Sequence, residues 1–87
     1  MDNIKTILKA LRKFNRMTQQ EVADKFSVSK PYICQIETGK NKVTLELVER
    51  YSRLFGIRKS LILQCAENKN QKLTKFEVRF LEYLKGE

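Results

Sequence analysis

The chain has 87 residues and carries 18 lysines and arginines against 10 aspartates and glutamates, a formal net charge of +8 at pH 7. This length supports one domain with one modest core, and the positive charge favours a polyanionic partner such as nucleic acid. With no histidine, no Gly-rich phosphate loop and no CxxC pair, the sequence argues against an enzyme, and we expect neither a cofactor nor a metal.

The first expected helix lies near the N-terminus. Apolar residues recur there at helical spacing, and either Asp2 or Asn3 is the expected cap. The residues of this apolar stripe are Ile4, Ile7, Leu8, Leu11 and Phe14.

Four further helix starts follow one pattern, in which a cap residue stands between an apolar residue and another apolar residue four positions later. The cap oxygen accepts an unpaired backbone N–H, and the apolar pair packs across it as a hydrophobic staple. Glutamates stand three residues after the first and the last cap and complete capping boxes. The four predicted caps are Thr18, Ser29, Thr44 and Thr74.

Glycines at positions 39 and 56 are expected to end two of these helices. Residues 57–65 predict another short helix, although Arg58 caps poorly. Residues 67–72 are polar and predict a linker, and nothing alternates with the period of two that marks a strand. The expected fold is therefore all-α.

Residues 19–39 predict two short amphipathic helices joined by a tight turn. Small Ala23 suits a close helix crossing, and Val28 fills the gap between the helices. This layout resembles the Cro/C1-type helix-turn-helix family, which includes lambdoid repressors and restriction–modification controller proteins, over about Ile4 to Leu63. The resemblance implies a five-helix lambda-repressor-like DNA-binding domain in residues 1–66, followed by a linker and an additional helix in 67–87. Ser27 departs from the family because glycine is usual at this turn.

Residues on the outer face of the second helix of the motif are expected to contact DNA bases, as the resemblance implies. Lys30 can donate to guanine, and Gln35 can pair with the N6 and N7 of adenine. Pro31 offers an apolar surface to a thymine methyl group. Tyr32 and Cys34 complete the predicted base-contacting set.

Contacts to the DNA backbone are expected from the flanks of the motif. Gln19 begins the first helix of the motif, where N–H groups favour a phosphate. The other predicted backbone contacts are Lys13, Arg16, Thr38, Lys40, Asn41 and Lys42. The family also commonly pairs the positions of Arg12 and Glu37 in a partly buried salt bridge. This pair fixes the second helix of the motif, which the family uses as its recognition helix.

The last helix, at about residues 74–85, leaves two alternatives open. Its apolar face either finishes the core of the same chain or forms a homodimer interface, which DNA recognition by two half-sites requires. We predict the second alternative. The proposed interface residues are Leu61, Leu63, Phe76, Phe80, Tyr83 and Leu84.

These features predict a dimeric repressor that binds double-stranded DNA at a pseudo-palindromic operator, with contact to RNA polymerase as a further expectation. The alternative is an antitoxin that neutralises a toxin and regulates its own operon. Since no apolar run approaches the ~20 residues of a membrane span, and the N-terminus does not resemble a signal peptide, we expect no membrane association and a cytoplasmic location. In that reducing compartment Cys34 and Cys65 stay free thiols.

Overall fold

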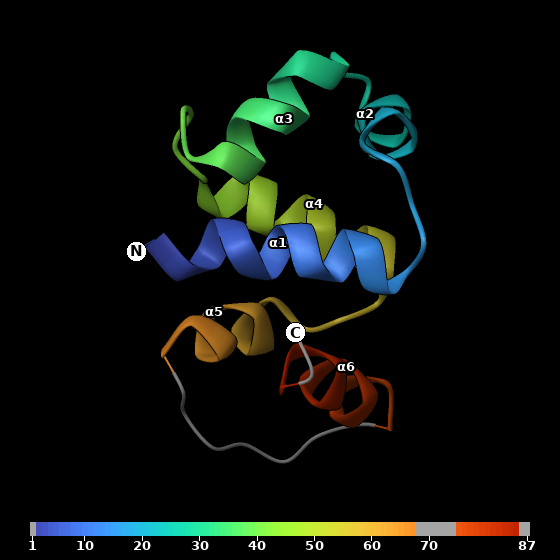
Figure 1. The fold of residues 1–87 in the computed structure, drawn as a ribbon, viewed down its shortest axis with the longest axis vertical. Helices are drawn as coiled ribbons and strands as arrows, with labels where there is room; N and C mark the ends of the chain where they lie inside the picture. Colours follow the sequence, from blue (N-terminus) through green and yellow to red (C-terminus); the bar gives the residue numbers. More distant parts are fainter. Residues whose placement is uncertain (1, 68–74, 86–87) are drawn as a thin grey trace.

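The computed structural model describes residues 2–67 and 75–85, and these residues form helices joined by short loops, with no strand among them (Figure 1). The all-α prediction is confirmed. The helices are α1 (Asp2–Phe14), α2 (Gln19–Phe26), α3 (Lys30–Thr38), α4 (Leu45–Phe55), α5 (Lys59–Glu67) and α6 (Lys75–Lys85).

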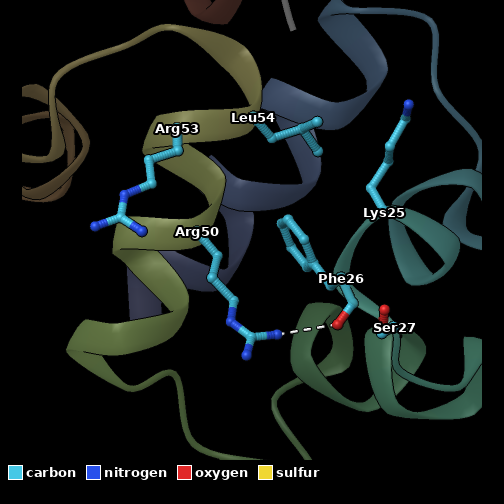
Figure 2. Close-up of a pocket in the computed structure, with 6 residues that line it drawn as sticks. All are labelled: Lys25, Phe26, Ser27, Arg50, Arg53 and Leu54. Atoms are coloured by element: carbon cyan, nitrogen blue, oxygen red, sulfur yellow. Dashed lines mark hydrogen bonds between the residues drawn. The ribbon is translucent and has the colours of Figure 1, made fainter.

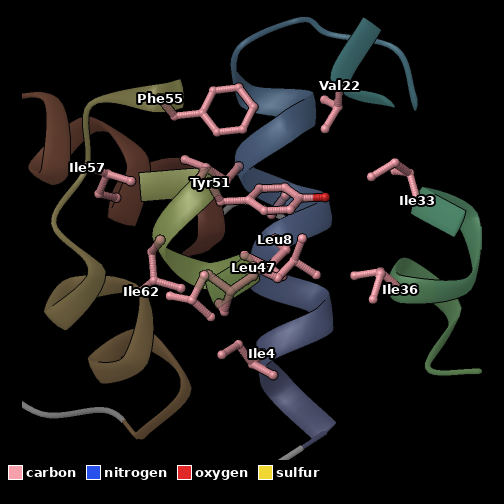
Figure 3. Packing of buried hydrophobic residues seen from close by; sticks show 14 of the residues in the cluster. Ile4, Leu8, Val22, Ile33, Ile36, Leu47, Tyr51, Phe55, Ile57 and Ile62 are labelled. Atoms are coloured by element: carbon pink, nitrogen blue, oxygen red, sulfur yellow. The ribbon is translucent and has the colours of Figure 1, made fainter. Parts of the chain in front are cut away.

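Helix α1 is the common support of the fold. Figure 1 shows α2 and α3 on one side of α1, and α5 and α6 on the other. Its residues Leu8 and Leu11 are fully buried, and they lie in one apolar cluster with Val48 of α4. Ile33 and Ile36 of α3 belong to the same cluster, and Figure 3 shows them together with Leu8. The apolar stripe predicted on the first helix is therefore what places the helix-turn-helix.

Three of the four predicted caps are confirmed. The hydroxyl of Thr18 accepts from the N–H of Glu21 at 3.0 Å, and the Glu21 carboxylate accepts from the Thr18 N–H at 2.9 Å, which completes the capping box. Ser29 accepts from the N–H of Tyr32 at 3.2 Å, and Thr44 accepts from that of Leu47 at 3.1 Å. The fourth predicted cap, Thr74, lies outside the described residues.

Two helix boundaries differ from the sequence-based expectation. Helix α1 already includes Asp2 and Asn3, the residues expected to cap it. Helix α5 runs to Glu67, the residue at which we expected the linker to begin. At its start the carbonyl of Arg58 accepts the N–H groups of Leu61 and Ile62 at 3.0 and 3.2 Å. The backbone of Arg58 thus starts the helix, although its side chain is a poor cap.

The turn after α2 is strained and is supported from α4. Ser27 adopts the left-handed conformation, with φ of 56°, which costs a non-glycine residue about 1–3 kcal/mol. Arg50 donates to the carbonyl of Phe26 at 3.0 Å, so a carbonyl in the last turn of α2 gains a hydrogen-bond donor (Figure 2).

The same region forms an open pocket of about 500 Å³ lined by Lys25, Phe26, Ser27, Arg50, Arg53 and Leu54. Both arginines also form exposed ion pairs with glutamates one turn earlier on α4.

Candidate nucleic-acid interface

The packing of α2 on α3 determines which residues of α3 face outward. Val22 and Ala23 of α2 are completely buried, as are Ile33 and Ile36 of α3. Ala23 has no side chain beyond Cβ, so the two helices can approach closely. With its inner face fixed in this way, α3 turns its opposite face to solvent.

The exposed face of α3 carries most of the residues predicted to contact bases. Lys30 and Pro31 are exposed in its first turn, and Cys34 and Gln35 follow on the next turn. Thr38, which is predicted to contact the DNA backbone, is exposed one turn further on. Tyr32 differs from the others because it is half-buried and packs against the core. The structure therefore brings the remaining predicted base contacts into one stripe and sets Tyr32 at its edge.

A buried ion pair fixes α3 against α1. The Arg12 Nε donates to Oε2 of Glu37 at 2.6 Å, and Nη2 donates to Oε1 at 3.0 Å. The Arg12 side chain is 10% exposed and that of Glu37 only 1%. Two parallel charge-assisted bonds of this kind restrict both position and orientation. The pairing implied by the family resemblance is thus present in the structure.

Two further hydrogen bonds extend this ion pair into a network. Arg12 Nη1 donates to the carbonyl of Met17 at 2.8 Å, which ties down the loop before α2. The side-chain amide of Gln19 donates to Oε1 of Glu37 at 3.0 Å. The Gln19 side chain therefore braces the recognition helix, while a DNA-backbone contact by this residue stays a prediction.

The loop after α3 places Lys40 and Lys42 in solvent and keeps Asn41 half-buried. The Asn41 side chain donates to Oε1 of Gln35 at 2.6 Å. Gly39 ends α3 with φ of 85°, and a Cβ at this glycine would lie 2.7 Å from Nζ of Lys5. Lys5 thus adds an amine beside this basic loop. Lys5 could not be predicted from the sequence, because it lies far from the helix-turn-helix motif and belongs to no motif.

Lys13 and Arg16 lie at the other end of α1, in its last turn and in the loop that leads to α2. Both side chains are exposed. Arg16 has φ of 57°, a left-handed conformation that turns the chain toward α2. Their predicted role in backbone contacts remains a prediction.

The structure buries two residues of the predicted dimer interface within the chain itself. Phe80 is completely buried within the chain, and its ring lies 5.5 Å from that of Phe14 on α1. Leu61 is 2% exposed and belongs to the same core. Both side chains are therefore covered by other residues of the same chain. Phe80 thus contributes to the core of its own chain, and a role of the other residues in a dimer interface stays a prediction.

The other predicted interface residues are placed differently. Leu63, Tyr83 and Leu84 are half-buried at the edge of the core. The Tyr83 ring lies 5.2 Å from that of Phe14. The side chain of Phe76 lies outside the described residues.

Tyr51 of α4 is a buried side chain whose hydroxyl makes no hydrogen bond to the described residues. Its side chain points from α4 toward α3 (Figure 3). Burial raises the pKa of the Tyr51 phenol strongly, the carboxylate of Glu37 raises it further, and the Arg12 guanidinium opposes the rise. The phenol thus stays neutral in the folded chain beyond the pH at which a free tyrosine ionises.

We therefore expect Tyr51→Phe to leave the free energy of unfolding at pH 7 unchanged, or to raise it by up to about 1 kcal/mol, because it removes an unsatisfied buried group. The unfolded phenol ionises near pH 10. Because the folded pKa is raised, stability is fully present below about pH 10 and falls as pH rises above it. Urea unfolding at pH 7, 10 and 11 should show a smaller alkaline loss for the variant. An equal loss in both proteins would contradict this assignment.

No three histidine, cysteine, aspartate or glutamate side chains come together to hold a metal within residues 2–67 and 75–85. Across the same residues, the helices are all too short or too polar to span a bilayer.

Comparison with known proteins gives two matches to this architecture. The sequence model of the Helix-turn-helix family matches residues 8–62, from α1 to α5. A protein of Methanocaldococcus jannaschii named as an uncharacterized HTH-type transcriptional regulator is 34% identical over 55 residues, which are 63% of this chain and 83% of that protein. No solved structure matches the chain significantly.

Proposed function

This chain belongs to the Cro/C1-type helix-turn-helix family, and we propose that it is a transcriptional regulator that binds double-stranded DNA sequence-specifically through α3. The observation that carries this proposal is the exposed stripe of α3 that includes Lys30 and Gln35. The buried Arg12–Glu37 pair holds this helix in place. A helix that reads base edges must present its side chains in a fixed register. The net charge of +8 adds the attraction to phosphate that such binding needs.

In the proposed complex α3 lies in the major groove. Lys30 donates to guanine, Gln35 contacts adenine, and Pro31 lies against a thymine methyl group. The amines of Lys40 and Lys42 contact phosphates beside the groove, where Lys5 adds to the positive potential. Phosphate contacts position the protein, and the α3 side chains select the sequence.

We further propose that the active species is a homodimer on a pseudo-palindromic operator and that it represses by covering promoter DNA. One α3 reads only a few base pairs, and a two-fold dimer doubles the site. The half-buried Leu63, Tyr83 and Leu84 leave apolar edges for a subunit contact. We also propose that residues 1–66 form the DNA-binding domain, and that residues 67–87 add a linker and a helix that belongs to the same domain or to the dimer interface. The antitoxin alternative is less favoured, because α6 directs Phe80 into its own core.

Two classes of substitution test the roles assigned to these side chains. We expect Gln35→Ala and Lys30→Ala each to weaken specific binding by about 1–3 kcal/mol and to relax the preference at one base pair. Lys42→Ala should weaken binding to all sequences alike. It should also reduce, by about one, the steepness with which the logarithm of the affinity falls with the logarithm of the salt concentration. Titrations of specific and random duplexes at several salt concentrations measure both effects. An unchanged base preference in Gln35→Ala would contradict the proposed register of α3.

A further inference from the structure

Gln35 of α3 is held by the loop that follows the helix. Asn41 Nδ2 donates to the Gln35 side-chain Oε1 at 2.6 Å, and the Asn41 backbone N–H donates to the Gln35 carbonyl at 3.2 Å. One loop residue therefore fixes both the backbone and the side chain of one α3 residue. Asn41 itself is half-buried, whereas Gln35 is exposed.

The side-chain bond matters because a carboxamide can present either of two faces. Its oxygen only accepts and its nitrogen only donates, so rotation by half a turn exchanges the two. Adenine offers an acceptor at N7 and a donor at N6, and therefore matches only one of these orientations. An exposed glutamine without a partner samples both orientations. The bond from Asn41 selects the orientation in which Oε1 faces the loop, and it leaves Oε1 one lone pair and Nε2 both of its protons.

We propose that Asn41 is a positioning residue that sets the orientation of the Gln35 carboxamide and thereby helps to determine which base is read. This inference rests on the proposed function, since it assigns a specificity determinant within the same DNA-binding surface. It revises the expectation that Asn41 contacts the DNA backbone: its side-chain amide faces Gln35, and the exposed Lys40 and Lys42 on either side remain for phosphates.

The first test compares the unaltered chain with Asn41→Ala on a specific duplex and on its three single-base-pair variants at the position read by Gln35. The net free energy of one neutral hydrogen bond of this kind corresponds to a factor of about 3–10 in a binding constant. We expect discrimination among the four base pairs to fall by about this factor. Binding to random duplex and the thermal midpoint should remain close to those of the unaltered chain, because the substitution removes no charge and no core contact.

The second test reverses the hydrogen bond. In Asn41→Asp the carboxylate can only accept, so Gln35 must turn and donate Nε2 to it, with Oε1 then facing the groove. We expect the preference for adenine at that position to weaken, because the oxygen and the nitrogen of the Gln35 carboxamide have exchanged places. The added negative charge also weakens binding to all DNA, and the same substitution in a Gln35→Ala background measures that loss separately.

Three outcomes separate the alternatives. The proposal is supported if Asn41→Ala flattens the base preference in the unaltered chain but has no further effect on it in the Gln35→Ala background. The two residues then act as one unit. A uniform loss of affinity with an unchanged base preference overturns it and makes Asn41 a phosphate contact. If the unaltered chain shows no sequence preference at all, the proposed function fails, and this inference fails with it.

Discussion

Glu37→Ala is expected to lower the free energy of unfolding by about 3–5 kcal/mol, because it leaves the buried Arg12 guanidinium without its counter-charge. The carboxylate is 1% exposed and accepts two bonds from Arg12 and a third from Gln19. A domain of this size has a total stability of only about 5–15 kcal/mol. A substantial fraction of the variant should therefore unfold at moderate temperature or in dilute denaturant.

Chemical denaturation of Arg12→Ala, Glu37→Ala and the double variant measures the coupling between the two residues. The matched control is Glu49→Ala, which breaks the exposed pair of Glu49 with Arg53 on α4 and should cost under about 1 kcal/mol. We expect the double variant to be much less damaged than the sum of the two single variants. Additive losses, or a Glu37→Ala cost no larger than that of the control, would contradict the role of this pair.

Phe80→Ala is expected to cost about 3–5 kcal/mol, the range for removing a buried aromatic ring. The ring is fully buried, and its centroid lies 5.5 Å from that of the Phe14 ring. Val78→Ala on the same helix is the matched control, since Val78 is 40% exposed and its truncation should change stability by about 0.5 kcal/mol or less. Thermal or urea unfolding of the two variants measures the difference.

The same variant distinguishes the two roles considered for α6. If Phe80 belongs to the core, its loss lowers stability at every protein concentration. If it instead joined two subunits, the variant would sediment as a folded monomer, and the stability of the unaltered chain would rise with its concentration. A folded and stable monomer of Phe80→Ala would therefore contradict the packing of α6 on α1.

The sequence was sufficient to predict features that depend on local spacing. The caps Thr18, Ser29 and Thr44 could be predicted because a cap, its staple and its helix all lie within a few residues. The outward face of α3 followed from the positions of Ile33 and Ile36. The pairing of Arg12 with Glu37 came from the family resemblance, since these residues are 25 positions apart in sequence.

The features that sequence analysis missed depend on contacts between distant parts of the chain. An amphipathic α6 fits equally well on its own core or on a partner, and residue spacing alone does not reveal that Phe80 lies beside Phe14. The Asn41–Gln35 bond depends on how the chain leaves α3 through the left-handed Gly39. The bond from the Gln19 amide to Glu37 joins residues that are 18 positions apart in sequence. Such geometry is absent from residue spacing alone.

Selection of duplex DNA from a random-sequence library by the purified full chain tests most directly whether α3 reads bases. We expect enrichment of an inverted repeat whose half-site centres lie about 10 base pairs apart or at a near multiple. In the same selection, Gln35→Ala should lose preference at one position of each half-site and keep it elsewhere. A pool that stays random after repeated rounds, although the protein is folded and retains DNA, would contradict sequence-specific recognition by this surface.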